Sequence, residues 1–277
     1  MKTFSLLAFM VLGTACAGSR VAPQGTEPAA TIVLASELKW EQLNPARGDQ
    51  SPKAAALWGD RKGPGPSGFL VRFVDGFSSP PHIHNVSYRG VVIEGLVHND
   101  DPSAEAMWMP TGSFWTQPRR AAHITAAKGT DTLAYIEIEE GPYLVRPVEQ
   151  AIQSDEKPRN LDASNIVWLN ASEIGASAPI DAAAPDDLKV AFLWGSSPDE
   201  KPRGILVKLR ARSASVMRSR SSTFHAVVIQ GRLAHQAAGG SDPTVLGPCT
   251  YIGASGAVAR ISCESGEDCI LYVRIAD

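Results

Sequence analysis

Short runs of β-branched and aromatic residues, separated by Gly, Pro and Asp turns, recur along most of the chain. They are GFLVRFVDG at 68–76, RGVVIEGLVH at 89–98, TLAYIEIEEG at 132–141, RGILVKLRA at 203–211, HAVVIQGRLAH at 225–235 and CILYVRIAD at 269–277. The period of three to four residues that marks an amphipathic helix is hard to find. Because β-branched and aromatic residues favour strands, the pattern predicts an all-β sandwich or barrel.

The runs repeat in a constant register of 136 residues, the distance from Leu57 to Leu193. The matching segments are Leu57-Trp58-Gly59 with Leu193-Trp194-Gly195, 68–71 with 204–207, and 91–95 with 227–231. Three matches in one register predict tandem domains of about 110 to 130 residues, since solenoid repeats are shorter. We place the first domain at 32–150 and the second at 164–277, with a polar boundary near 150–163.

Composition agrees with one or two globular domains. The 277 residues are 44% hydrophobic and carry a formal net charge of −3, so the chain can bury a sizeable core. Lys and Arg do not run in blocks, which gives no electrostatic reason to expect nucleic acid as a partner.

The first 16 residues have the features of a secretory signal: one Lys, a short apolar run and small residues before Cys16. The ending LGTAC resembles a bacterial lipobox, although Leu12 lies four residues before the cysteine instead of three. Residues 17–31 are small and polar, as a flexible tether would be. We therefore expect an exported, periplasmic-side protein that meets the membrane only through a lipid on Cys16; cleaved soluble export is the alternative.

Two of the other cysteines flank a turn-like stretch. Cys263 and Cys269 enclose ESGED between two β-rich runs. In an oxidising compartment they could bridge a hairpin, which would leave Cys249 as a free thiol. Unpaired thiols are the alternative, because the sequence does not supply the geometry that a disulfide needs.

The segment GFSSPPHIHNVSYRG and the region after it carry motif spacings that resemble those of a cupin, a small double-stranded β-barrel. The matching positions are Gly76, His82, His84 and Gly95 in the first motif and Gly112, Pro118 and His123 in the second. Two positions depart from the family pattern: Tyr88 stands where cupins have a glutamate, and Arg120 where they have a glycine. The resemblance implies an all-β bicupin, two tandem barrels, of which the first binds metal.

The residues support a metal site by a separate route. Side chains two apart on a strand share a face, so His82 and His84 point the same way, and a later strand can bring His123 to them. Three neutral imidazoles suit one divalent ion, with Fe(II) or Zn first and Mn, Ni or Cu as alternatives. A site with three protein ligands keeps positions open for substrate.

Tyr88 and Glu94 are the candidate catalytic residues. Tyr88 could be a weak ligand or a hydrogen-bond donor beside the metal, since a phenol is protonated at neutral pH. Glu94 shares its face by strand alternation and could supply the missing carboxylate, unless the turn at Gly95 disturbs the strand. Glu137 and Glu139 also alternate, and we expect them on a solvated strand face.

The second half has lost this site. In the repeat register His82 corresponds to Arg218, His84 to Arg220 and, after a one-residue slip, His123 to Arg260. Arginine stays protonated and does not ligate metals, so the second domain should be metal-free. The three arginines either form an anion site or pair with acids at the barrel rim, because unpaired buried charge is costly.

Residues 30–277 as a whole resemble a bacterial bicupin family of largely uncharacterised proteins, through SPPHIHN, VVIEGLVHNDDP and MWMPTGSFWTQP. The chain is similar, more distantly, to cupin anti-sigma regulators and three-histidine dioxygenases. These resemblances imply a metal-dependent, dioxygenase-like oxidoreductase acting on a small molecule. The alternative is a non-catalytic lipoprotein that binds or senses a small molecule or metal. Pairing into a homodimer is a further expectation from the cupin resemblance.

Overall fold

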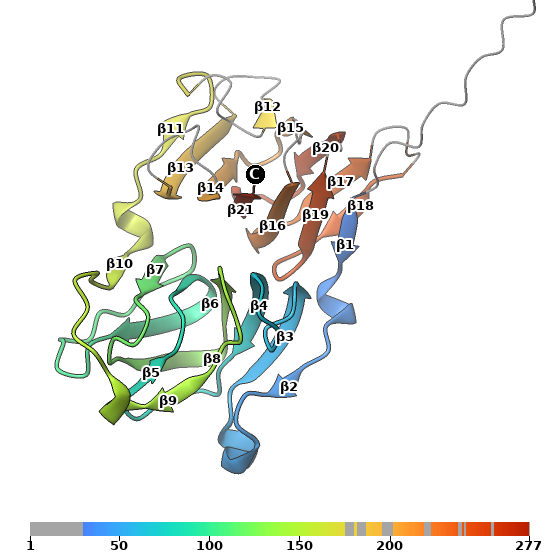
Figure 1. Ribbon diagram of the computed structural model, residues 1–277. Helices are drawn as coiled ribbons and strands as arrows, with labels where there is room; N and C mark the ends of the chain where they lie inside the picture. The colour runs from blue at the N-terminus through green and yellow to red at the C-terminus, as the bar shows by residue number, and fades with distance from the viewer. Residues whose placement is uncertain are drawn as a thin grey trace, which may run out of the picture.

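The computed structural model describes residues 30–174, 180–181, 187–195, 202–218, 223–237, 240, 242–255 and 258–276. The chain is all-β, as predicted (Figure 1). The only helical elements in these ranges are short 3-10 turns, η1 (Ala35–Glu37), η2 (Pro45–Gln50), η3 (Val148–Gln150) and η4 (Ala163–Asn165). None of the described helices is long and apolar enough to span a membrane.

Four sheets account for the strands in the described part of the chain. The first has seven strands in the order β10 (Arg159–Leu161), β7 (Phe114–Gln117), β6 (Tyr88–Asp100), β8 (Ile124–Ile138), β4 (Ser67–Arg72), β3 (Lys53–Trp58) and β2 (Glu41–Gln42). The second has seven in the order β1 (Thr31–Val33), β19 (Tyr251–Ser255), β16 (Thr223–Gln230), β21 (Cys269–Ala276), β14 (Arg203–Leu209), β13 (Leu188–Trp194) and β11 (Leu169–Asn170). A third contains β12 (Ile180–Asp181), β15 (Ala214–Arg218), β20 (Val258–Cys263), β17 (Leu233–Ala237) and β18 (Thr244–Leu246). The fourth pairs β5 (His82–His84) with β9 (Val145–Pro147).

The two seven-stranded sheets repeat one another strand by strand. Strands β6, β4 and β3 of the first sheet correspond to β16, β14 and β13 of the second, at the spacing seen in the sequence. Even the register breaks repeat: one falls between Val92 and Glu94 in β6, and another between Val228 and Gln230 in β16. The duplication inferred from the sequence repeat is therefore also present in the backbone hydrogen bonding of the two sheets.

The predicted domain bounds differ from the strand pairing at both ends. β1 begins the predicted first domain, yet it pairs with β19, so that Ile32 lies opposite Ile252 in the second sheet. β10 lies in the predicted boundary, yet it pairs with β7 of the first sheet, with Asn160 opposite Trp115. An unpaired edge strand is completed by whichever strand lies nearby in space, which sequence order does not reveal.

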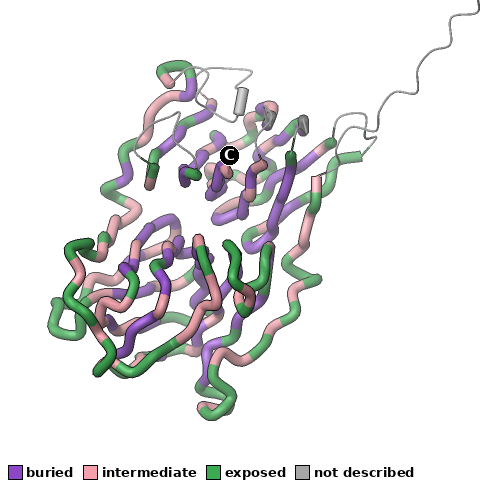
Figure 2. The backbone as a smooth tube through the Cα atoms, viewed as in Figure 1, coloured by how far each residue is buried: buried purple, intermediate pink, exposed green. Residues whose placement is uncertain are grey.

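Buried apolar residues form a core inside each half and a third cluster between the halves (Figure 2). The third cluster joins Leu70 and Tyr135 of the first sheet to Leu206 and Tyr272 of the second. Side chains on a strand alternate between its faces. The outward faces of the two large sheets therefore pack on one another, while their inward faces line the separate cores.

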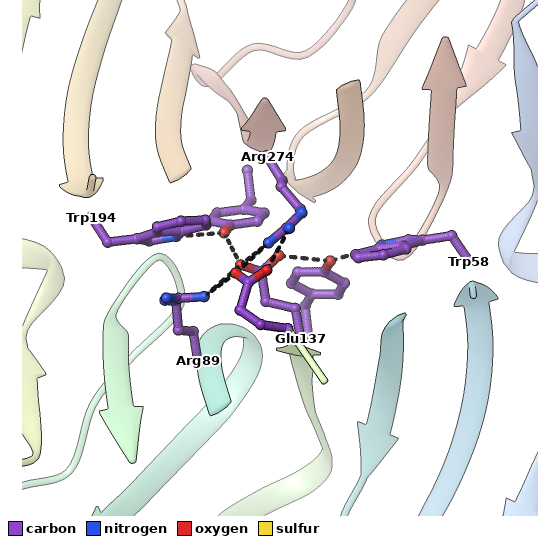
Figure 3. Close-up of polar contacts among 8 residues, drawn as sticks. Trp58, Arg89, Glu137, Trp194 and Arg274 are labelled. Carbon is purple, nitrogen blue, oxygen red and sulfur yellow. Dashed lines mark hydrogen bonds and ion pairs between the residues drawn. The ribbon is translucent and has the colours of Figure 1, made fainter. Parts of the chain in front are cut away.

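A polar network lies within this apolar interface (Figure 3). Tyr135 Oη donates to Glu137 Oε2 at 3.1 Å, and Tyr272 Oη donates to Glu137 Oε1 at 2.7 Å. Each tyrosine oxygen also accepts from an indole, Trp58 Nε1 at 3.0 Å and Trp194 Nε1 at 2.9 Å. The Glu137 carboxylate thus accepts one tyrosine hydrogen bond from each half, and in each half a tryptophan donates to that tyrosine.

Glu139 extends the network toward solvent. Arg274 of the second half donates to both oxygens of Glu139 at 2.7 Å, and Arg89 donates to it at 2.6 Å. The expectation of a solvated strand face is wrong for Glu137, which is 1% exposed. The second half covers this face of β8, and only the tertiary structure brings Arg274 there to compensate the buried charge.

Cys263 and Cys269 form a disulfide between the end of β20 and the start of β21. The bond closes the short loop that the sequence places between two β-rich runs. Cys249 is a free, buried thiol, and burial raises its pKa to about 11. It is therefore an inert packing residue at neutral pH.

Candidate metal centre

Three histidines from two segments meet at one end of the first half. His82 and His84 are the first and last residues of β5, and His123 immediately precedes β8. The backbones of His82 and His123 hydrogen-bond to each other in both directions at 3.0 Å. All three side chains are 9% exposed or less, and their potential ligand nitrogens lie within 4.8 Å of one another. Among the described residues, this is the one group of three or more potential metal ligands.

Backbone carbonyls fix the orientation of two of the rings. His82 Nδ1 lies 2.9 Å from Pro80 O, and His123 Nδ1 lies 3.2 Å from Ala121 O. A carbonyl only accepts, so each Nδ1 carries the proton and each Nε2 presents a lone pair. Metal-binding histidines are commonly held in this way by their second nitrogen. The three imidazoles therefore fit a divalent metal ion.

Electrostatics keeps the rings unprotonated. Burial, together with the neighbouring His82, lowers the pKa of His123 to about 3. Burial, with repulsion from His123 and His82, also holds the pKa of His84 well below its usual range. Neutral imidazole is the form that binds metals, so the cluster is ready for a cation at neutral pH.

Tyr88 reaches the site, as its position in the cupin motif implies. Its hydroxyl donates to Asn99 Oδ1 at 2.8 Å and lies 3.3 Å from His123 Nε2. Thr125 and Gln117 bond to the same amide side chain of Asn99. Burial raises the pKa of Tyr88 above its usual value, so it stays a neutral phenol.

Tyr143 is a site residue that sequence reasoning missed. Its ring stacks on His84 with centroids 4.2 Å apart, and its hydroxyl lies 3.2 Å from His84 Nε2. Tyr143 follows the last long strand of the first half, outside both cupin motifs. The pairing of β5 with β9 brings this segment back to the histidines, and no local pattern in the sequence indicates that pairing.

Glu94 is not part of the site. It is exposed, and the register of β6 shifts on both of its sides, between Val92 and Glu94 and between Glu94 and Leu96. The first shift lies between Tyr88 and Glu94 and interrupts the two-residue alternation on which the prediction relied. The placement of Glu94 on the same face as Tyr88 was therefore wrong.

The motif glycines occupy positions that need their flexibility. Gly76, Gly95 and Gly112 have φ values of 69°, 75° and 85°, in the left-handed region that side chains disfavour. Arg120, where cupins have a glycine, also has a positive φ of 58°. Its backbone N–H donates to His84 O at 2.8 Å, and its guanidinium donates to Gln150 O. The departure from the motif keeps the backbone conformation and adds an anchor for the loop.

The remaining predicted residues lie apart from this centre. Arg260 is exposed on β20 and does not face inward, which corrects its place in an inward anion site. Arg220 and Cys16 lie outside the described residues, as does the side chain of Arg218. Phe224, the counterpart of Tyr88, packs in the core of the second half.

A cavity of about 1270 Å³ opens beside the three histidines. Its walls include His82, His84, Tyr88, Tyr143 and Trp115. Of the aromatic stretch at 107–118, Trp115 therefore lines the cavity, whereas Phe114 packs between the two halves. The concave, mostly apolar wall with a few polar groups is typical of a small-molecule site.

Several solved structures that are similar to the chain share the cupin fold. A Nostoc punctiforme protein proposed to be a dioxygenase matches with a TM-score of 0.63 at 13% identity, over 92% of this chain and 85% of that one. The E. coli protein YlbA, of the DUF861 family, matches at 0.58 and 9% identity, over 91% and 92%. Oxalate decarboxylase from Bacillus subtilis, which has Mn(II) centres, matches at 0.52 and 12% identity, over 92% and 78%. At such identities the likeness shows the fold alone.

No curated protein sequence matches the chain. One family model does, and it is described only as a domain of unknown function. Its match extends over residues 31–277, which includes both seven-stranded sheets and the three histidines. On that match, the chain belongs to the DUF4437 family and has the cupin fold.

Proposed function

We propose that the protein is a metal-dependent oxidoreductase of the dioxygenase type that acts on a small organic molecule. The observation that carries the proposal is the convergence of His82, His84 and His123, of which His82 and His84 line a large cavity. Three protein ligands would leave positions open on a divalent ion. The likeness to a protein proposed to be a dioxygenase agrees with this reading.

A bound divalent ion would supply a Lewis acid and, if redox-active as Fe(II) is, a path for electrons between substrate and O2. In a dioxygenation both atoms of O2 enter the organic product, and the substrate supplies the electrons. No separate reductant is required. With Zn in the same place, hydrolytic or other Lewis-acid chemistry would replace oxidation.

The chain's own residues would position the reactants and control protons. Tyr143 places a neutral hydroxyl beside His84, where it can donate a hydrogen bond to a substrate oxygen. Tyr88 places its oxygen beside His123, where it can accept a hydrogen bond from a substrate hydroxyl. Trp115 and the other apolar residues of the wall would give the substrate an apolar surface to pack on. Asn99 Oδ1 accepts the Tyr88 proton in a 2.8 Å hydrogen bond, so the phenol oxygen is fixed as an acceptor before substrate binds.

The test is elemental analysis of protein purified without a metal-binding tag, followed by O2-uptake measurements with a panel of organic acids and β-dicarbonyl compounds. We expect one equivalent of metal and substrate-dependent O2 uptake, both lost in His84→Ala. The control is His235→Ala, since His235 is equally buried but lies in the second half. A wild-type protein that holds no metal after anaerobic reconstitution contradicts the proposal.

A binding protein without turnover is the second candidate. The observation that favours it is the absence of a carboxylate from the described metal cluster, because Glu94 is exposed and Tyr88 is a neutral phenol. Such a site holds a metal and a ligand but has no strong base. Tight ligand binding by metal-loaded protein, with no O2 uptake and no product by mass spectrometry, would select this candidate.

We further propose that the protein is exported and tethered by a lipid on Cys16, which the lipobox-like ending LGTAC supports. Detergent-phase partitioning of wild-type protein and of Cys16→Ser, both expressed in a bacterium, tests this. We expect the wild type with the membranes and the variant in the soluble fraction. Membrane-free wild-type protein that retains residues 1–16 by mass spectrometry would contradict it.

A further inference from the structure

The lining of the cavity carries more positive than negative charge. Its lining includes the cations Arg47, Arg61 and Lys62 and a single acid, Glu41. Lys62 Nζ lies 2.8 Å from Glu41 Oε2, and Arg61 pairs with Glu41 Oε1. The one carboxylate is thus shared between two cations, which leaves this lining with two net positive charges.

Arg61 is the cation best placed to meet a ligand. Its side chain is 14% exposed, against 67% for Lys62. Its guanidinium lies over the Phe69 ring, 5.7 Å from the centroid, and its charge acts on Tyr143, the neighbour of His84. Within the described residues the Arg61 guanidinium makes one hydrogen bond, from Nη2 to Glu41. A guanidinium has five N–H donors, so most of them remain for a bound anion.

The rest of the cavity suits an apolar group. Val71, Phe73, Phe77, Trp115 and Ile136 line it beyond the histidines. A volume of about 1270 Å³ exceeds what a two-carbon diacid needs, since sites of roughly 300 to 1,000 Å³ already take drug-sized ligands. The walls therefore have the room and the apolar surface for a ligand with a substantial hydrocarbon body.

From these observations we infer that the substrate is an organic carboxylate with an aromatic or long aliphatic body, whose carboxylate binds the Arg61 guanidinium. The inference rests on the proposed function in that it places substrate in the cavity beside the three histidines. Arg61 acts here as a specificity-determining residue. Charge-assisted, two-pronged hydrogen bonds from arginine are among the strongest that proteins make to carboxylates.

Calorimetric titration with three probes that share one body tests the inference: phenylpropanoate, phenylpropanol and phenylpropylamine. Acetate serves as a carboxylate without the body. Each is titrated into metal-loaded protein and into protein stripped by a chelator, because a carboxylate could also bind the metal. We expect phenylpropanoate to bind roughly tenfold more tightly than the alcohol in both forms, and the amine and acetate to bind more weakly than phenylpropanoate.

Variants locate the source of the preference. Arg61→Gln should remove the tenfold advantage of the carboxylate, and Arg61→Lys should retain part of it, because charge persists without the planar fork. The matched control is Arg210→Gln, which removes an arginine that also pairs with an acid, Asp187, in the other half. Thermal unfolding of each variant shows whether it is folded before its affinities are compared.

Three results would overturn the inference. They are equal affinity for acid and alcohol, a preference unchanged in folded Arg61→Gln, and a preference present only in the metal-loaded form. Failure of the proposed function looks different. A protein that prefers the carboxylate without metal but never consumes O2 leaves this binding site in place and removes the oxidoreductase.

Discussion

Tyr272 Oη donates a 2.7 Å hydrogen bond to Glu137 Oε1, although 135 residues separate the two along the chain. Tyr135 makes the equivalent bond to the other carboxylate oxygen from within the first half. In the repeat, the residue equivalent to Glu137 is Arg274, which lies 3.6 Å from that carboxylate. The duplicated halves therefore differ at one repeat position, which is an acid in the first half and a cation in the second, and the two side chains face each other across the interface.

The same strands carry the interface on one face and the metal site on the other. On β6, Tyr88 points to the cavity while its neighbour Arg89 bonds to Glu139. On β8, Ile136 lines the cavity while Glu137 lies in the interface. The second half, although it lacks the histidines, thus packs directly behind the strands that position the site.

Replacement of Glu137 should destabilise the protein strongly. Glu137→Leu removes the acceptor of both tyrosine hydroxyls and leaves the Arg274 charge with fewer partners, at a cost of about 3 to 5 kcal/mol in the free energy of unfolding. Glu137→Gln keeps an acceptor oxygen and should cost less. Urea denaturation measures both, with Glu140→Gln as the exposed control. A Glu137→Leu protein as stable as wild type would show that the network contributes little.

Acid should weaken the interface through Glu139. Burial alone would raise its pKa, but the hydrogen bond and charge of Arg274 and the charge of Arg89 lower the pKa of Glu139 below its ordinary 4.5. A folded-state pKa below the unfolded one stabilises the protein above the unfolded value, and that stability is lost as pH falls through the folded value. For Glu137 burial raises the pKa, so its contribution has the opposite sign and falls as pH rises above 4.5.

Unfolding measured from about pH 3 to pH 7 separates these two effects. The stability difference between wild type and Glu139→Gln should be largest near neutrality and should shrink below the ordinary pKa of the glutamate. The stability difference between wild type and Glu137→Gln should instead decrease as the pH rises above 4.5. A Glu139→Gln difference that is constant with pH would mean that this carboxylate titrates alike in the folded and unfolded chains.

Removing the hydroxyl of Tyr143 should weaken metal binding more than it weakens the fold. Tyr143→Phe keeps the ring that stacks on His84 and deletes only the oxygen beside Nε2. His84 Nδ1 makes no hydrogen bond among the described residues and is available to bind the metal, while Nε2–H donates to the Tyr143 oxygen. Loss of such an outer hydrogen-bonding group typically costs about tenfold in metal affinity or more. Competition with a chromophoric chelator measures the affinity. Tyr88→Phe is the matched comparison at His123, and unchanged affinity in both variants would make the phenols irrelevant to the metal.

Because β1 pairs with β19 of the second sheet, we expect a residue near the N-terminus to stabilise the C-terminal half. Ile32 on β1 packs against the core of the second half. Ile32→Ala should lower the free energy of unfolding by about 1 to 2 kcal/mol, less than a fully buried isoleucine. Thr31→Ala, on the exposed side of the same strand, should change it by less than about 0.5 kcal/mol. Equal effects of the two substitutions would argue that β1 contributes only backbone hydrogen bonds.

Strand composition and the two-residue alternation were enough to predict an all-β chain, the duplication and the common face of His82 and His84. The motif glycines could be recognised for a local reason, since a backbone with positive φ favours glycine. These features depend on interactions within a few residues, which the sequence records directly.

The tertiary structure alone decided the placement of Glu94, Tyr143 and Glu137. Register shifts in β6 moved Glu94 to the surface, pairing of β9 with β5 brought Tyr143 to His84, and the covering second half buried Glu137. Each depends on which distant strand is adjacent. That choice is made by the packing of complementary faces and edges over the whole chain, so no local pattern of residues contains it.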